Sequence, residues 1–208
     1  MNAKDFSAHW KKFISQNCIS KSDWLKYYND NHLWTEITIG LKCSEEINSP
    51  FGDFLKNVSG LIYRKEDGLT DLAFSENDFF NKIYSLHNSE SKRKEVLPKN
   101  AFYPKYYDIL VEHENNIYLC FQEMIKLTYY RARLKVLITY NENIDDSSDY
   151  KYVNDLLINN FCTIIKEATE KHHENRDTEY LLIIGQMNHG TLAWNYYIFD
   201  YKGKLVNT

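Results

Sequence analysis

The sequence predicts a single α/β domain over residues 1–208, in which helices flank a mixed central sheet. Two observations carry this expectation. The run Lys135 to Tyr140, KVLITY, is nearly continuous in apolar and β-branched residues, which is typical of a strand buried on both faces. The run Leu157 to Ala168 repeats apolar side chains at helical spacing. A composition of 43% hydrophobic and 26% charged residues, with only 7 Gly and 3 Pro, excludes collagen-like and largely disordered chains.

The elements before residue 106 are predicted from aromatic spacing and from turn residues. Phe6, Trp10 and Phe13 recur at helical spacing, so residues 1–50 are expected to form a helical N-terminal extension. Pro50 precedes a short helix that ends near Gly60. The next expected elements are strands at 61–64 and 70–74 around a turn-rich connection, a short helix at 79–86, and an exposed basic insertion at 87–105.

The elements after residue 106 form the rest of the sheet. Side chains alternate between the two faces of a strand at 107–114, so Asp108, Glu112 and Glu114 share one face. A helix at 117–130 then leads into the KVLITY strand. Residues 51–140 are expected to form the core, and residues 141–208 to add the long helix and strands at 180–184 and 194–200, joined through Gly185 to Gly190.

Several classes of protein are excluded by what the sequence lacks. No window approaches the ~18 apolar residues of a membrane helix, and the first residues lack the apolar run of a secretory signal. We therefore expect a cytoplasmic protein with no membrane contact. The four cysteines form no CxxC pair, which argues against a zinc site or a disulfide framework. Motifs of NTPases, dinucleotide-binding enzymes, α/β-hydrolases and zincins are also missing.

The strongest chemical signal is the pair of carboxylates in the strand at 107–114. Glu112 and Glu114 are two residues apart and so lie on the same face. Like charges this close repel each other, and burying them without a partner is costly. A hard divalent cation such as Mg²⁺ removes both problems, because it binds carboxylate oxygens and keeps water ligands for chemistry. The alternatives are a solvated strand face and carboxylates paired with nearby Lys or Arg.

This acidic strand, preceded by a hairpin that contains Asp71 and followed by a helix and a buried strand, resembles the restriction-endonuclease-like PD-(D/E)xK nuclease superfamily. The resemblance covers roughly residues 51–140. It implies an α-β-β-β-α-β core, with an Asp on the second strand and an acid-x-Lys pair on the third. Here Asp71 stands at the first position and Glu112-His113-Glu114 at the second, so Glu114 replaces the expected lysine. Some members carry a lysine or a carboxylate on the following helix instead, where Glu123 and Lys126 stand here.

The resemblance implies a Mg²⁺-dependent endonuclease that cleaves DNA, with RNA as an alternative substrate and a homodimer as an assembly compatible with the chain's size. Asp71, Glu112 and Glu114 would hold the metal, and Asp108 is the rival to Asp71 because it shares the strand face of the glutamates. Lys126, or Glu114 acting as a base, would position or deprotonate the attacking water.

The charge distribution suggests where a phosphodiester backbone would bind. The net charge of the chain is −4, yet residues 92–135 hold nine Lys and Arg against five Asp and Glu. The basic residues expected to contact nucleic acid are Lys92, Arg93, Lys99, Arg131 and Arg133.

Two other functions fit the same sequence. The overall negative charge and the missing catalytic lysine suit a non-catalytic module, an immunity-like or regulatory protein that presents its aromatic residues to a protein partner. The third hypothesis is a nuclease fold without activity.

Overall fold

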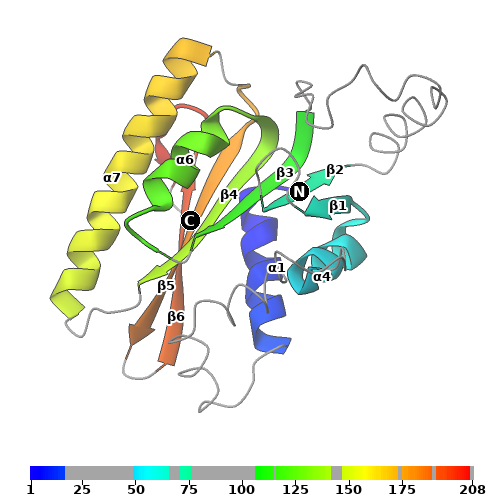
Figure 1. The fold of residues 1–208 in the computed structure, drawn as a ribbon, viewed down its shortest axis with the longest axis horizontal. Coiled ribbons are helices and arrows are strands. Elements are labelled where there is room, and N and C mark those ends of the chain that lie inside the picture. The colour runs from blue at the N-terminus through cyan, green and yellow to red at the C-terminus, as the bar shows by residue number, and fades with distance from the viewer. Residues whose placement is uncertain are drawn as a thin grey trace, which may run out of the picture.

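A computed structural model describes residues 1–16, 49–65, 71–75, 106–114, 116–141, 147–172, 175–188 and 191–206. Within these residues the chain is α/β, with a mixed sheet of seven strands and four helices (Figure 1). The strands are β1 (Ile62–Lys65), β2 (Leu72–Ser75), β3 (Tyr106–Glu114), β4 (Arg131–Asn141), β5 (Glu179–Asn188), β6 (Thr191–Phe199) and β7 (Leu205–Val206).

The strands lie in the sheet in the order in which they occur along the chain. β1, β2 and β3 are antiparallel, β3, β4 and β5 are parallel, and β5, β6 and β7 are antiparallel again. A parallel pair needs a crossover. Helix α6 (Cys120–Thr128) makes the crossover from β3 to β4, and helix α7 (Ser147–His172) makes the crossover from β4 to β5 (Figure 1).

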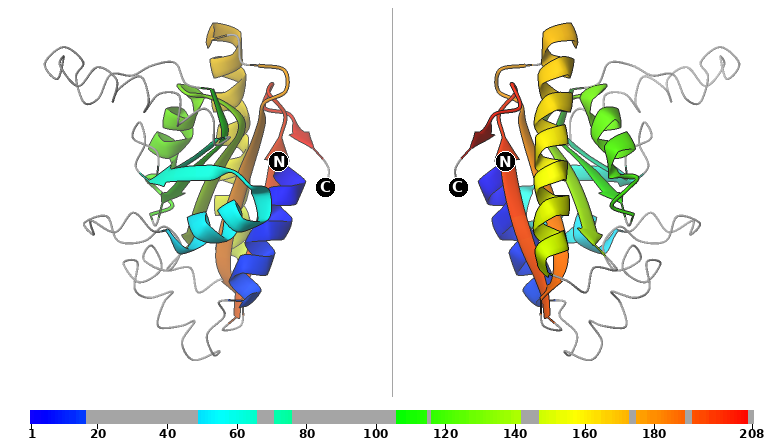
Figure 2. Two further views of the ribbon diagram at one scale, coloured as in Figure 1. Left: turned by 90° about the vertical axis from the view of Figure 1, so that its right-hand side faces the viewer. Right: turned by 90° about the vertical axis from the view of Figure 1, so that its left-hand side faces the viewer.

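Helices cover both faces of the sheet. Helices α1 (Ala3–Gln16) and α4 (Pro50–Ser59) lie on one face, and α6 and α7 lie on the other (Figure 2). Each face has its own core: Ile109 and Val111 of β3 pack toward α1 and α4, whereas Leu110 packs toward α6 and α7. The alternation predicted for β3 is therefore confirmed, and Glu112 falls on the face that α6 covers.

Local sequence explains where α4 begins and ends. The Ser49 hydroxyl accepts a hydrogen bond from the Gly52 N–H at 3.0 Å, and Pro50 occupies the first turn, where no N–H partner is needed. Gly60 ends the helix with φ at +72°, a conformation that costs glycine little.

Two glycines with positive φ offer a matched test of backbone strain. A Cβ added at Gly203 would lie 2.3 Å from the carbonyl oxygen of Cys162, whereas at Gly60 it would meet nothing within 4 Å. Both alanine variants incur the cost of a left-handed residue, of about 1–2 kcal/mol. We therefore expect Gly203→Ala to lower the free energy of unfolding well beyond Gly60→Ala in urea titrations. Equal losses would show that the contact with Cys162 is relieved without cost.

Two predictions for the second half of the chain are confirmed, the pairing of two strands and the burial of one of them. The strands predicted at 107–114 and 135–140 are indeed adjacent, in β3 and β4, and helices bury β4 from both sides. Helix α7 is longer than predicted, and α6 is shorter than the expected 117–130. The helix predicted at 79–86 and the insertion at 87–105 lie outside the described residues.

Two strands extend beyond their predicted bounds. Strand β4 begins at Arg131, four residues before the predicted start at Lys135, and so includes Arg131 and Arg133. Gly185 does not open a turn but pairs within β5, between Tyr140 and Trp194. A Cβ there would lie 2.9 Å from the Trp194 ring and 3.0 Å from the Tyr140 Cβ, so close packing requires this glycine. No helix in the described part of the chain is long and apolar enough to cross a membrane.

Candidate active site

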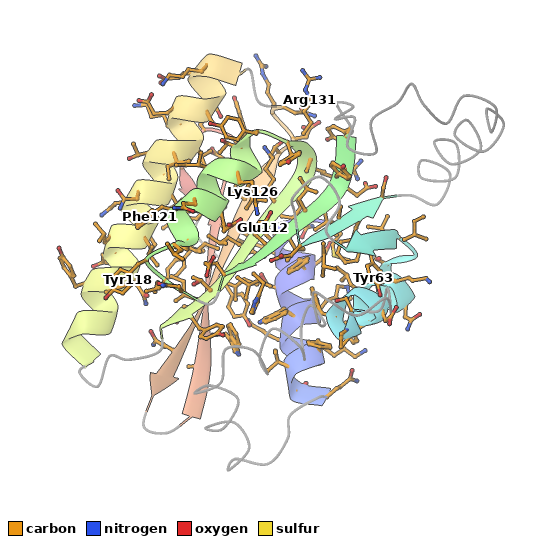
Figure 3. All side chains as sticks on the ribbon, in the orientation of Figure 1. Tyr63, Glu112, Tyr118, Phe121, Lys126 and Arg131 are labelled. Carbon is orange, nitrogen blue, oxygen red and sulfur yellow. The ribbon has the colours of Figure 1, made fainter. Side chains whose placement is uncertain are left out.

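The candidate site is centred on Glu112, a glutamate on β3 that is buried beneath α6. Only 1% of the residue is exposed. Its burial follows from the strand pattern, because Leu110 precedes it by two residues on the same face and belongs to the core under α6 and α7. Figure 3 shows Glu112 and Lys126 close together where α6 crosses the sheet.

Lys126 of α6 lies between two carboxylates. Its ammonium is 2.9 Å from Oε2 of Glu112 and also forms an ion pair with Glu123, one turn earlier on the same helix. Met124 and Leu127 of α6 are buried against the sheet. With the helix in this orientation, the side chain of Lys126 reaches Glu112 on β3. The site therefore contains a cation that is supplied by the protein itself.

Asp71 immediately precedes β2 and lies next to Glu112. Leu72 pairs with Val111 in the antiparallel ladder of β2 and β3, so continuing the register by one residue places Asp71 opposite Glu112. The Oδ2 atom of Asp71 accepts a hydrogen bond of 2.7 Å from the backbone N–H of His113. This bond fixes the carboxylate at the edge of the site.

These surroundings strongly perturb the titration of Glu112. Burial is the largest cause, followed by the negative charge of Asp71, and together they raise the pKa of Glu112 to about 9. Lys126 acts in the opposite direction but does not offset them. In the described residues, no hydrogen-bond donor reaches the buried Oε1 atom of Glu112.

The pKa of Lys126 is also raised. Burial alone would lower it, but the hydrogen bond with Glu123 and the negative charge and hydrogen bond of Glu112 outweigh burial. The ammonium thus stays charged at neutral pH, while the carboxyl group of Glu112 favours its protonated form.

His113 lies on the opposite face of the sheet and does not join the carboxylates. It is buried beside Tyr140, with 5.9 Å between the ring centroids, and burial lowers the pKa of its imidazole to about 4. His113 therefore stays neutral in the folded protein at neutral pH. The prediction that alternation places His113 on the face opposite Glu112 is confirmed.

The other residues predicted for the site have surroundings different from those of Glu112 and Asp71. Glu114 accepts a hydrogen bond of 2.7 Å from the Asn116 N–H, beyond the end of β3. Asp108 lies roughly 13 Å from Glu112 along the strand, by strand geometry, and faces Arg133 with 4.0 Å between charged atoms. Arg131 is exposed at the start of β4 (Figure 3). Lys92, Arg93 and Lys99 are outside the described residues.

The fit of this site to Mg²⁺ depends on Asp71 and Glu112. In the side-chain positions of the described residues, no three His, Cys, Asp or Glu side chains gather closely enough to hold a metal. Mg²⁺, however, is commonly held by one or two carboxylates together with waters and substrate phosphates. When Glu112 is ionised, its buried Oε1 atom and the neighbouring carboxylate of Asp71 would offer such a pair of hard oxygen donors.

Two residues of this region were not among the predicted site residues. Glu123 is named with Lys126 on the helix that follows the acidic strand but is given no role in the site, and it forms an ion pair with Lys126. Lys135 was included in an apolar strand, yet its side chain is fully buried on β4 and donates a hydrogen bond of 3.0 Å to the Tyr180 hydroxyl. In the sequence, the only sign of this buried hydrogen bond is a lysine inside the apolar KVLITY run, because its partner Tyr180 lies 45 residues away.

The chain matches no known family model, no curated protein and no solved structure.

Proposed function

We propose that the protein is a metal-dependent nuclease with a restriction-endonuclease-like core, and that Asp71, Glu112 and Lys126 form its active site. The order of elements α4, β1, β2, β3, α6 and β4 supports this assignment, because it follows the α-β-β-β-α-β order of that superfamily. The observation that carries the proposal is the buried Glu112 carboxyl, placed between the carboxylate of Asp71 and the ammonium of Lys126. Perturbed titratable groups in mutual contact are typical of active sites.

Each residue has a role that follows from its place. Asp71 and Glu112 would hold Mg²⁺, which would supply Lewis acidity and an activated water when bound. Lys126 is held by Glu123 and Glu112, and its ammonium would contact a phosphate oxygen of the substrate. Glu123 acts through Lys126 by fixing the position of the ammonium group.

The test is cleavage of DNA and of RNA with Mg²⁺, compared with the same reactions in EDTA. We expect Glu112→Ala to lower the cleavage rate by more than the roughly 10- to 100-fold that loss of an outer partner costs. Glu114→Ala is the matched control, because Glu114 is also a glutamate of β3 but bonds to Asn116. Equal rates for wild type and Glu112→Ala, or cleavage that persists in EDTA, would contradict the proposal.

A nuclease fold without activity is the alternative that one observation favours. Lys126 already places a positive charge beside Glu112 and Glu123, so part of the negative charge is balanced without a metal ion. Absence of cleavage on all substrates, with a correctly folded protein, would support this alternative or the protein-binding module.

A further inference from the structure

Exposed tyrosines and arginines gather at the end of the sheet where the parallel strands begin. Tyr106 opens β3 and pairs in register with Arg131, which opens β4. Tyr129 lies two residues before Arg131, at the end of α6. The turn between α7 and β5 joins this group, because the side-chain amide of Asn175 lies 3.3 Å from the Tyr106 hydroxyl, with Arg176 next to it. We call Tyr106, Tyr129, Arg131 and Arg176 the tyrosine–arginine patch.

The aromatic rings of this patch are presented to solvent. Tyr129 is 71% exposed and Tyr106 is 39% exposed, although burial of an aromatic ring would be favourable. The hydrogen bond from Asn175 restrains the Tyr106 ring, so less conformational entropy would be lost when a ligand stacks on it.

The charge around the patch is mixed. Arg131 and Arg176 are exposed, and Arg133 lies beside them but faces Asp108 at 4.0 Å. The exposed Asp177 follows Arg176 directly. Because these carboxylates reduce the positive potential, affinity for a polyanion would depend on stacking as well as on charge.

We propose that the tyrosine–arginine patch binds single-stranded nucleic acid. Bases of any sequence stack on aromatic rings, with a stacking free energy of about 1–3 kcal/mol per base. Arginines bind the phosphates. In a duplex the base faces are already stacked on each other, so exposed rings favour unpaired strands. The inference rests on the proposed nuclease function and names its substrate class, because the patch and Glu112 share strand β3, roughly 20 Å apart by strand geometry.

The experiment measures binding apart from cleavage. Fluorescence anisotropy would follow a labelled strand of about 16 nucleotides, the upper range of common single-strand sites, and a duplex of equal length, both in EDTA. We expect Tyr129→Ala to weaken binding of the single strand by about tenfold, the loss of one stacked base. The matched control is Tyr152→Ala on α7, since Tyr152 is 70% exposed and lies about 30 Å from the patch by helix length.

Replacing the arginines tests the second part of the patch. The double variant Arg131→Ala, Arg176→Ala should weaken binding and reduce the slope of log affinity against log salt by about 1–2, because two phosphate contacts are lost. Tyr129→Ala should leave that slope unchanged, since stacking releases no counterions.

The outcomes separate this inference from the nuclease proposal. The inference is overturned if Tyr129→Ala and Tyr152→Ala bind the single strand alike, or if the duplex binds as tightly as the single strand. If the tyrosine effect is present but no strand is cleaved with Mg²⁺, the binding site stands and the nuclease function fails. If cleavage occurs but Tyr129→Ala has no effect on binding, only the patch is refuted.

Discussion

Replacing Trp10 with alanine is expected to lower the free energy of unfolding by about 3–5 kcal/mol, the usual cost of removing a buried tryptophan. Trp10 is fully buried in α1 and contacts three other aromatic rings. The ring centroids of Phe51 and Trp194 lie 4.9 Å and 5.3 Å away in edge-to-face arrangements, and that of Phe13 lies 6.0 Å away. The side chain thus joins α1, α4 and β6, so its loss leaves a cavity that no single element can close. Urea titration followed by circular dichroism measures the loss.

Tyr152→Ala provides the control for this prediction. It also removes a large aromatic side chain from a helix, but one that is mostly exposed, so its effect should stay within about 0.5 kcal/mol. If Trp10→Ala proved equally mild, α1 would not be part of the cooperative core. Because Ile109 and Val111 of β3 pack against the same cluster, loss of α1 would also loosen the strand that carries Glu112.

Much of the fold could be predicted from the sequence, because burial dictates the pattern of the elements concerned. The KVLITY run reads as a buried strand because it lies between two helical layers, and α7 repeats apolar residues where it faces the sheet. The boundaries were less predictable. Gly185 resembles a turn residue in the sequence, and only the neighbouring Tyr140 and Trp194 show why the strand requires it.

The candidate site was predictable only where strand geometry decides it. Alternation along β3 places Glu112 on one face and His113 on the other, whatever the rest of the fold does. The rotation of α6 about its own axis cannot be predicted from strand alternation, since it depends on how Met124 and Leu127 pack. For this reason Lys126 could be named a candidate, but its contact with Glu112 and the part played by Glu123 could not be foreseen. The hydrogen bond that Glu114 accepts from Asn116 likewise depends on where β3 ends.

Glu112→Gln is expected to make the protein more stable at alkaline pH and to flatten the dependence of stability on pH. The pKa of Glu112 is raised from 4.5 to about 9 in the folded state, first by burial and then by Asp71. The folded protein therefore binds a proton that the unfolded chain releases. This contribution to stability is fully present below pH 4.5 and is lost as the pH rises toward 9, by up to about 1.4 kcal/mol per pH unit. Glutamine keeps the shape of the side chain without this titration.

The choice of pH range isolates Glu112 from His113. The pKa of His113 is lowered from 6.5 to about 4 by burial, so the histidine costs stability as the pH falls below 6.5. Between pH 6.5 and 9 only the glutamate of this pair changes protonation, and there the wild type should lose stability relative to Glu112→Gln as the pH rises. Urea titrations across that range measure the difference. Parallel stability curves for the two proteins would mean that Glu112 is ionised in the folded state, with Lys126 as its full counter-charge. The charged carboxylate of Glu112 would then lie beside that of Asp71, with Lys126 bound to Glu112 and the His113 N–H bound to Asp71.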